Sequence, residues 1–325
     1  MTQVQTYLDQ FAALVPKHGG PIPWTLSFDF GKHDQHMVFG AITHGNETGS
    51  LPGFVQMAQA LANGEFEYGG RVTLMLGNIE ACKKDQRFLE ADLNRVFLEE
   101  APESLEKKRA FEMMEVLNQA DVFIDFHQTI EPSEKPFYIF PFHESGYQWA
   151  KLLGGGTSLI TRDSRHAFSA GCVCADEFAR NRGIPGITLE MGQKGITEIA
   201  KELTWQTMER ALNALNAVAA GQSIKAQLES SNPPEFEFIE IQYAESFSGP
   251  GSQLEPGLLN FTWVEKSQVI GKHDDGSDMV VPQAGYLVFP KYPQRDEHGI
   301  VIGRAPGQIY NLAVKMDEHP LIAFA

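Results

Sequence analysis

Short runs of almost continuously apolar residues, separated by amphipathic helical stretches, constrain the fold of this chain more than any other feature. Strands that are covered on both faces read as unbroken apolar runs, whereas half-exposed strands alternate polar and apolar residues. The first two thirds of the chain contain five such runs: MVFGAIT (37–43), RVTLMLGN (71–78), DVFIDFH (121–127), YIFPF (138–142) and GITLEM (186–191). These runs predict the strands of a largely buried sheet.

Helices are expected between these strands. The helical stretches are LPGFVQMAQALAN (51–63), ESLEKKRAFEMMEVLNQA (103–120) and TEIAKELTWQTMERALNALNAVAA (197–220). In the second stretch, apolar residues recur at roughly helical spacing: Leu105, Phe111, Met114 and Leu117. Alternation of strands and helices predicts an α/β fold.

The character of the chain changes after a polar stretch that ends in Pro-Pro (221–234). The following EFEFIEIQYAE (235–245) alternates with period two, and further strand-like runs are separated by Gly, Pro and Asp turns. We therefore expect an α/β domain over residues 1–225, which would carry the function, and a smaller β-rich domain over 226–325.

Composition and net charge argue against several classes of function. A formal net charge of −16 argues against a general nucleic-acid binder, because phosphate contacts need a basic face. No apolar stretch reaches the roughly 18 residues of a transmembrane helix, and the N-terminus lacks the features of a secretory signal. Three cysteines form a sparse, odd set that suits a reducing compartment. We expect a cytoplasmic protein with no nucleic-acid or membrane partner.

Four polar residues stand at or near the ends of predicted strands. His44 and Glu47 follow the first strand, His127 ends the third, and Glu190 lies near the end of the fifth. In open α/β sheets, functional groups gather at the carboxyl ends of the strands. Two imidazoles and a carboxylate form a known catalytic zinc set, which activates water and polarises a carbonyl. Glu190 is suited to be the general base.

Each of these residues also has a structural interpretation. A His–x–x–Glu pair occurs by chance, and a histidine at a strand end is usually hydrogen-bonded to its surroundings. A glutamate in an apolar strand is more telling, because burying an unpaired carboxylate costs several kcal/mol or shifts its pKa. Arg87, Asn94 and Arg95 lie between Glu47 and His127, and the guanidinium groups of the two arginines suit a carboxylate. An exposed helix face with internal Asp–Arg pairs is the alternative there.

An ordered series of four motifs resembles the succinylglutamate desuccinylase and aspartoacylase family, zinc-dependent relatives of the metallocarboxypeptidases. The motifs are HGNE, then GN…RF…DLNR, then DFHQT and finally LEMGQ, within residues 42–193. The resemblance implies a zinc-carboxypeptidase-like mixed sheet flanked by helices. It also implies one zinc ion held by His44, Glu47 and His127, with Glu190 as the catalytic acid and base.

The resemblance also implies how a substrate is held. Asn94 and Arg95 would bind a substrate carboxylate or polarise the scissile carbonyl, and Arg87 matches the arginine that precedes their motif. Arg180 is a candidate for a second carboxylate clamp, and Arg182 competes with it. The C-terminal domain partly covers the site in aspartoacylases and adds a tyrosine, for which we choose Tyr286, with Tyr292 as the alternative.

One departure from the family concerns the pair after the third ligand, Gln128–Thr129, where desuccinylases tend toward Thr-Ala and aspartoacylases toward Asn-Thr. The zinc chemistry is unaffected, but the acyl group is left open.

The predicted reaction is hydrolysis of the amide bond of a small anionic N-acyl amino acid. The alternatives are a metallocarboxypeptidase or amidase acting on a peptide, and a catalytically silent zinc-binding relative. The oligomeric state, monomer or homo-oligomer, is also left open.

Overall fold

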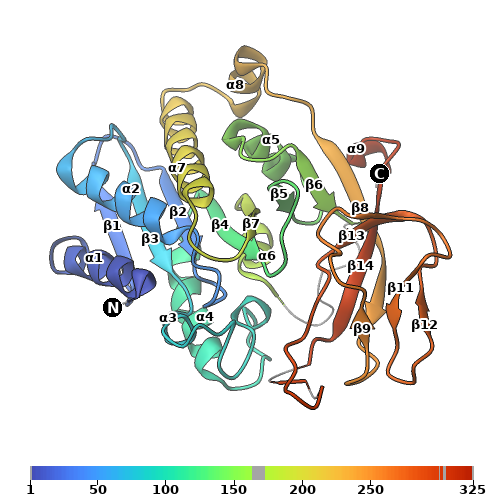
Figure 1. Cartoon of the computed structure of the whole chain (residues 1–325). Helices are drawn as coiled ribbons and strands as arrows, with labels where there is room; N and C mark the ends of the chain where they lie inside the picture. The colour runs from blue at the N-terminus through green and yellow to red at the C-terminus, as the bar shows by residue number, and fades with distance from the viewer. Residues whose placement is uncertain (1, 163–172, 300, 303–304, 324–325) are drawn as a thin grey trace.

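The computed structural model describes residues 2–162, 173–299, 301–302 and 305–323 (Figure 1). A mixed sheet of eleven strands is flanked by helices, and a second, antiparallel sheet has three strands. This architecture confirms the predicted α/β class with a β-rich C-terminal part. Within the described residues, no helix is both long enough and apolar enough to cross a membrane.

Seven strands come from the first part of the chain: β1 (Thr25–Asp29), β2 (His36–Ala41), β3 (Arg71–Leu76), β4 (Val122–Thr129), β5 (Phe137–Ile139), β6 (Ser158–Thr161) and β7 (Gly186–Gln193). Their order in the sheet is β1-β3-β2-β4-β7-β5-β6. Strands β3, β2, β4 and β7 are parallel neighbours, whereas β1 and β5 run antiparallel to β3 and β7. All five predicted strands are confirmed. β1 and β6 were not predicted, because segments of four or five residues are too short for a clear periodic signal.

The helices are α1 (Gln3–His18), α2 (Leu51–Asn63), α3 (Ile79–Cys82), the 3-10 helix η1 (Leu93–Arg95), α4 (Leu105–Leu117), α5 (Glu144–Leu153), α6 (Ala175–Arg180), α7 (Glu198–Ala219), α8 (Ile224–Ser231) and α9 (Pro320–Ala323). Helices α1, α2, α5 and α7 share one apolar core with the sheet, and α4 and α6 share another (Figure 1). The central strands are therefore covered on both faces, which is why they read as unbroken apolar runs.

The buried face of α4 matches the predicted one in part: Leu117 is buried and Met114 packs against the core, but Leu105 and Phe111 do not. Leu105 is 49% exposed and Phe111 is 39% exposed, although helical spacing predicted both on the buried face. The helix instead buries Ala110, Met113 and the carboxylate of Glu106, which is 1% exposed. Backbone N–H groups of residues 89–91 satisfy this carboxylate with hydrogen bonds.

The C-terminal strands are β8 (Glu237–Ser246), β9 (Gln253–Leu254), β10 (Trp263–Val264), β11 (Val269–Lys272), β12 (Asp278–Val280), β13 (Gly285–Val288) and β14 (Gln308–Lys315). Strand β8 pairs with β6 in parallel, and β14, β13 and β10 extend the same sheet antiparallel to one another. The three-stranded sheet has the order β12-β11-β9. The predicted boundary after residue 225 falls within α8, and the division into two domains stays a prediction.

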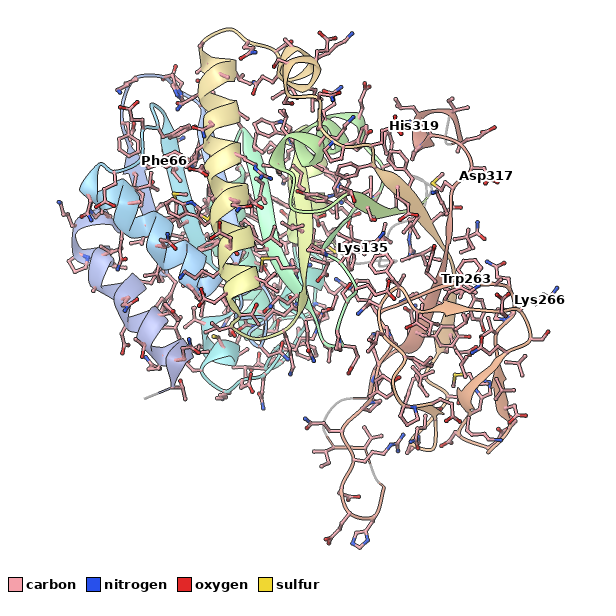
Figure 2. All side chains as sticks on the ribbon, turned by 45° about the horizontal axis from the view of Figure 1, so that its top comes forward. Phe66, Lys135, Trp263, Lys266, Asp317 and His319 are labelled. Atoms are coloured by element: carbon pink, nitrogen blue, oxygen red, sulfur yellow. The ribbon has the colours of Figure 1, made fainter. Side chains whose placement is uncertain are left out.

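Two buried or half-buried side chains join the C-terminal part to the segment after β4. The Asn260 amide donates to the carbonyl of Pro132 at 3.1 Å, and its Oδ1 accepts from the backbone N–H of Phe289 at 2.7 Å. Lys135 forms an ion pair with Glu237 on β8 at 2.7 Å, and Figure 2 shows Lys135 at this junction. The chain just beyond the strand that carries His127 is thereby tied to the C-terminal part.

Candidate metal centre

The strand order brings four of the predicted site residues to one edge of the sheet. Strands β2, β4 and β7 are adjacent and parallel, so their carboxyl ends meet. His44 and Glu47 lie in the turn after β2, and His127 and Glu190 occupy paired positions near the ends of β4 and β7. All four side chains are buried.

A sharp turn after β2 directs His44 and Glu47 toward the other strands. Ile42 has φ of 59°, a left-handed conformation that costs a β-branched residue roughly 1–3 kcal/mol. The backbone N–H of Asn78 donates to the Ile42 carbonyl at 2.7 Å and holds this turn. Gly45 packs so closely that a Cβ there would lie 2.4 Å from the backbone nitrogen of Cys82. The turn therefore depends on the segment that follows β3.

Three side chains converge on a common centre. The Nδ1 atom of His44 lies 2.7 Å from Oε1 of Glu47, and Nδ1 of His127 lies 3.0 Å from Oε2 of the same carboxylate. The two Nδ1 atoms are 3.2 Å apart. All three ligand atoms lie within 4.8 Å of one another. Each side chain thus presents a metal-ligating atom to one point.

A second layer of carboxylates orients the two imidazoles. Nε2 of His44 lies 3.1 Å from Asp92, and Nε2 of His127 lies 2.9 Å from Asp125. For His127, a carboxylate in this position keeps the proton on Nε2 and leaves the Nδ1 lone pair free for a metal. Two imidazoles and one carboxylate are ligands that zinc and other divalent cations accept. The donor set therefore fits a divalent cation.

The charges of the cluster support this fit. Although burial alone lowers the pKa of His127, the charges of Asp125 and Glu47 outweigh it and raise that pKa well above its ordinary value. The pKa of Glu47 lies well below its ordinary value because the charge of His44 and its hydrogen bonds to both histidines outweigh the raising effect of burial. The cluster thus favours positive charge at its centre, which a divalent cation supplies.

We expect Asp125→Asn to weaken divalent-cation binding by about 10–100-fold, because the amide no longer fixes the His127 tautomer. Asp125 is fully buried, and it also accepts a hydrogen bond from Thr43 at 3.0 Å. The affinity is measured by competition with a chromophoric chelator. Asp34→Asn, at an exposed position before β2, is the control. Equal affinity in the two variants would show that Asp125 does not tune the ligand.

Glu190 lies beside the cluster without belonging to the donor set. Its side chain is 7% exposed, and its Oε2 atom is buried without a hydrogen-bond partner among the described residues. Burial and the neighbouring charge of Glu47 raise the pKa of Glu190 to about 8, against the lowering effect of His127 and Arg87. A carboxyl group in this state exchanges a proton near neutral pH, as a general acid and base must.

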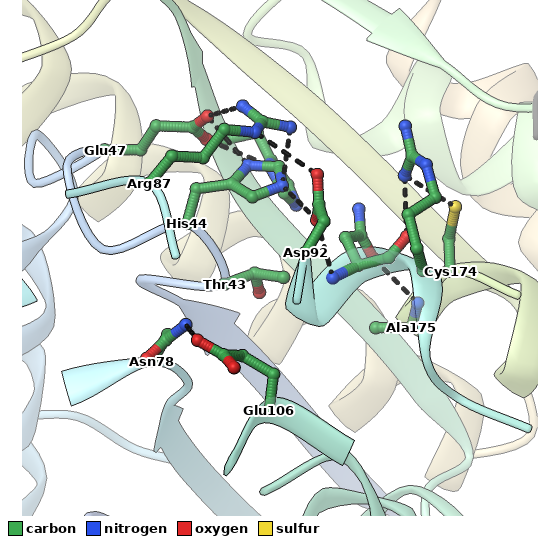
Figure 3. Close-up of polar contacts among 12 residues, drawn as sticks. Thr43, His44, Glu47, Asn78, Arg87, Asp92, Glu106, Cys174 and Ala175 are labelled. Atoms are coloured by element: carbon green, nitrogen blue, oxygen red, sulfur yellow. Dashed lines mark hydrogen bonds and ion pairs between the residues drawn. The ribbon is translucent and has the colours of Figure 1, made fainter. Parts of the chain in front are cut away.

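Arg87 lies against the metal-ligating side chains (Figure 3). Its guanidinium donates to Glu47 at 3.0 Å and to Asp92 at 3.3 Å, and its Nη2 is 2.7 Å from Nε2 of His44. Burial would raise the pKa of Asp92, but the charges of His44 and Arg87 bring it well below its ordinary value. Because the Arg87 side chain is still 31% exposed, its guanidinium group lies between the buried cluster and solvent.

Asn94 and Arg95 belong to η1, which begins after Asp92. The backbone N–H of Asn94 donates to Asp92 at 3.0 Å, and its side-chain oxygen accepts from the backbone N–H of Ala175 at 2.9 Å. Arg95 donates to the Asn94 carbonyl at 2.6 Å and contacts the Cys174 sulfur at 3.4 Å. These contacts hold both side chains next to Asp92.

Lys291 is a third cation near the cluster that was not predicted from the sequence. Burial and the positive charges of Arg87 and Arg95 lower its pKa to about 8, while Asp92 opposes them. Lys291 lies between β13 and β14, and its backbone N–H donates to the carbonyl of Ile309 at 2.9 Å. The C-terminal part therefore contributes positive charge on the side of the two arginines.

Two predicted substrate contacts have partners away from the cluster. Arg180, on α6, forms an ion pair with Asp176 at 2.5 Å and donates to the Gly186 carbonyl at 3.0 Å. Tyr286, on β13, packs edge-on against Trp263 with ring centroids 5.0 Å apart. The alternative Tyr292 donates to the carbonyl of Glu255 at 2.8 Å. The substrate roles of Arg180 and Tyr286 stay predictions.

The departure at Gln128 has a structural role. Its Oε1 accepts from the backbone N–H groups of Gly49 and Gly195 at 2.7 and 3.1 Å. Its Nε2 donates to the carbonyls of Gln193 and Gly195 at 2.8 and 3.0 Å. The side chain thus joins the turn after β2 to the end of β7, and its polar atoms are engaged with the backbone.

Asp125 could have been found from the sequence. Residues two apart in a strand face the same side, so Asp125 precedes His127 on the same face of an apolar strand. Asp92 belongs to the DLNR motif, but its contact with His44 was not predicted. Lys291 carried no comparable signal, because it lies in an irregular segment that only the tertiary structure brings to the cluster.

Comparison with known proteins identifies relatives of this chain. Residues 34–220 match the family model of the succinylglutamate desuccinylase/aspartoacylase catalytic domain. Succinylglutamate desuccinylase from Pseudomonas paraeruginosa is 24% identical over 270 residues, which cover 78% of this chain and 79% of that protein. The same enzyme from Photorhabdus laumondii is 26% identical, with 79% and 82% covered.

Solved structures share the fold. The ectoine utilization protein EutE (DoeB) from Ruegeria pomeroyi aligns with a TM-score of 0.67 at 15% identity and covers 89% of this chain and 88% of that chain. Murine aminoacylase 3 aligns with a TM-score of 0.60 at 19% identity, with 87% and 96% covered. Because the family model spans more than half of the sequence, the chain belongs to the succinylglutamate desuccinylase/aspartoacylase family.

Proposed function

We propose that this protein is a zinc-dependent hydrolase that cleaves the amide bond of a small anionic N-acyl amino acid. The observation that carries the proposal is the convergence of His44, Glu47 and His127 beside Glu190, whose buried Oε2 has no partner among the described residues. Membership of the family supports a deacylase reaction, and the relatives named above include succinylglutamate desuccinylases.

His44, Glu47 and His127 would hold one zinc ion per chain. When bound, such a cation makes water more acidic and polarises a carbonyl group. Glu190 accepts the proton of the attacking water on its Oε2 atom and returns it to the leaving nitrogen. Its raised pKa suits both transfers. Asp125 keeps the proton of His127 on Nε2, and Asp92 lies against Nε2 of His44.

The cations near the cluster would select an anionic substrate. Arg87 and Arg95 flank Asp92, and Lys291 adds charge from the C-terminal part. We assign the orientation of a substrate carboxylate to Arg87 and Asn94, and charge stabilisation at the scissile carbonyl to Arg95. The C-terminal part would cap the site, which limits entry to small molecules and disfavours a peptide substrate.

The test is amine release from a panel of N-acyl amino acids that includes N-succinylglutamate and N-acetylaspartate. We expect turnover of at least one member, complete loss of turnover after chelation, and recovery with added zinc. Metal-loaded protein that hydrolyses no member but cleaves C-terminal residues from peptides would favour the carboxypeptidase alternative. Metal binding with no hydrolysis of either class would favour a catalytically silent relative.

The same panel identifies the acyl group, because its members differ in acyl chain or amino acid.

The described cysteines, Cys82 and Cys174, form no disulfide, in keeping with our assignment to the cytoplasm. That assignment rests on composition.

A further inference from the structure

Glu106 is a buried carboxylate outside the cluster of metal-ligating side chains. It lies in the first turn of α4 and is 1% exposed, while the adjacent Leu105 is 49% exposed. Burial of a carboxylate is unfavourable unless hydrogen bonds replace its hydration. A helix that exposes a leucine and buries a glutamate at its start therefore needs an explanation in the contacts of that glutamate.

The contacts converge from one short segment. Oε1 of Glu106 accepts from the backbone N–H of Leu89 at 2.7 Å, and Oε2 accepts from those of Glu90 and Ala91 at 3.2 and 3.1 Å. The side-chain amide of Asn78 donates to Oε1 at 3.1 Å (Figure 3). Although burial raises the pKa of Glu106, the hydrogen bonds from Leu89 and Ala91 lower it overall, so the group is charged at neutral pH.

A reciprocal bond locks the segment and the helix together. Oε2 of Glu90 accepts from the backbone N–H of Leu105 at 2.7 Å. Asn78 is also the N-cap of α3, where its side chain accepts from the backbone N–H of Ala81. Glu106 therefore connects three parts of the chain: the start of α4, the start of α3 and residues 89–91.

The segment held by Glu106 carries the cationic side of the site. Arg87 lies two residues before Leu89, and Asp92, Asn94 and Arg95 follow Ala91 directly. Residues 83–92 contain no helix or strand, so no ladder of backbone hydrogen bonds fixes them. Three successive backbone N–H groups bound to one carboxylate supply that fixation.

We propose that Glu106 is a positioning residue, whose buried carboxylate holds residues 87–95 against the metal-ligating side chains so that Arg87 and Asn94 meet an anionic substrate. This inference rests on the proposed function for its substrate class. Asn94 and Arg95 have additional contacts with Ala175 and Cys174, so loss of Glu106 displaces Arg87 most and affects substrate binding more than the chemical step.

Glu106→Gln is the first test. Glutamine has the same shape, but its amide NH2 group would face backbone donors and cannot accept their hydrogen bonds. We expect KM for an anionic N-acyl amino acid to rise about tenfold or more, because small displacements of binding groups are costly, while kcat changes less. Metal content stays at one ion per chain. Glu106→Asp, which keeps the charge, is expected to recover part of the lost affinity.

Glu103→Gln is the matched control. Glu103 lies just before α4 and pairs with Lys107 at the surface, with its side chain 79% exposed. The Glu103→Gln substitution removes one carboxylate from the same region but does not change the contacts of residues 89–91. The KM of this variant should therefore equal that of the wild type. A fall in the melting temperature of the Glu106 variants with unchanged KM would overturn the proposal and leave Glu106 a purely structural residue.

A second measurement does not depend on turnover. Amide hydrogen exchange at Leu89, Glu90 and Ala91 should accelerate in Glu106→Gln and stay slow in Glu103→Gln. If the wild type hydrolyses no member of the panel, the proposed function fails, and this exchange measurement still decides whether Glu106 fixes the segment. Unchanged exchange in Glu106→Gln would overturn the positioning role even if the protein is an active deacylase.

Discussion

Replacement of Glu190 by glutamine is expected to lower kcat by roughly 10²–10⁴-fold, the range that general acid–base catalysis contributes. The amide keeps the shape of the side chain but can neither accept nor return the proton. Because Glu190 lies beside the donor set and not within it, the variant should bind one metal ion per chain as the wild type does. Steady-state kinetics together with metal analysis of the same preparation test both statements.

Glu131→Gln provides the comparison for Glu190. Burial also raises the pKa of Glu131, which follows β4, but this residue is not part of the cluster. Its substitution should leave kcat within a few fold of the wild type. If Glu190→Gln retained wild-type turnover while holding its metal, another group would have to be the base.

The pH profile follows from the same residue. A base acts only when deprotonated, so kcat/KM should rise with pH as Glu190 loses its proton. The protein groups alone raise the pKa of Glu190 to about 8. A bound divalent cation favours the charged carboxylate, so the rise should lie below pH 8 in the metal-loaded enzyme. The Glu190→Gln variant should lack this limb of the profile.

Replacement of His127 by alanine should remove the metal and the activity together. His127 supplies one of the three ligand atoms. Loss of a residue that only orients a ligand, such as Asp125, weakens metal binding by up to roughly 100-fold, and we expect His127→Ala to weaken it more. Turnover should fall to background at metal concentrations that saturate the wild type. Metal titration followed by the assay of the titrated samples measures both quantities.

His298→Ala is the control for loss of an imidazole, because the His298 side chain is 74% exposed. It should bind metal and turn over substrate as the wild type does. If His127→Ala retained full affinity, the cation would be bound elsewhere. If it retained activity without metal, the reaction would not use this centre.

Much of the fold was predictable, because strands that are buried on both faces appear in the sequence as almost continuous apolar runs. The runs that became β2, β3, β4, β5 and β7 are apolar throughout, and α2 and α7 have the predicted bounds to within a residue or two. Periodicity predicted the buried face of α4 only in part. It placed Leu117 toward the core correctly, but it did not predict the burial of Glu106, whose partners at residues 89–91 are distant in sequence.

The sequence by itself determined which side chains could hold a metal or transfer a proton, because His44, Glu47, His127 and Glu190 stand at or near the ends of apolar runs. Their mutual distances came only from the tertiary structure. Strand order decides which ends are neighbours, and β2, β4 and β7 are adjacent although other strands separate them in the chain.

The surroundings of the cluster were also decided by tertiary structure alone. Asp92 and Lys291 lie in segments without regular structure, about two hundred residues apart in the chain. Long-range electrostatic interactions join them to one site, and such interactions follow distance in space and not position in sequence. A local sequence pattern therefore identifies the metal ligands of this centre. The charges around these ligands come from residues that only the tertiary structure brings close to them.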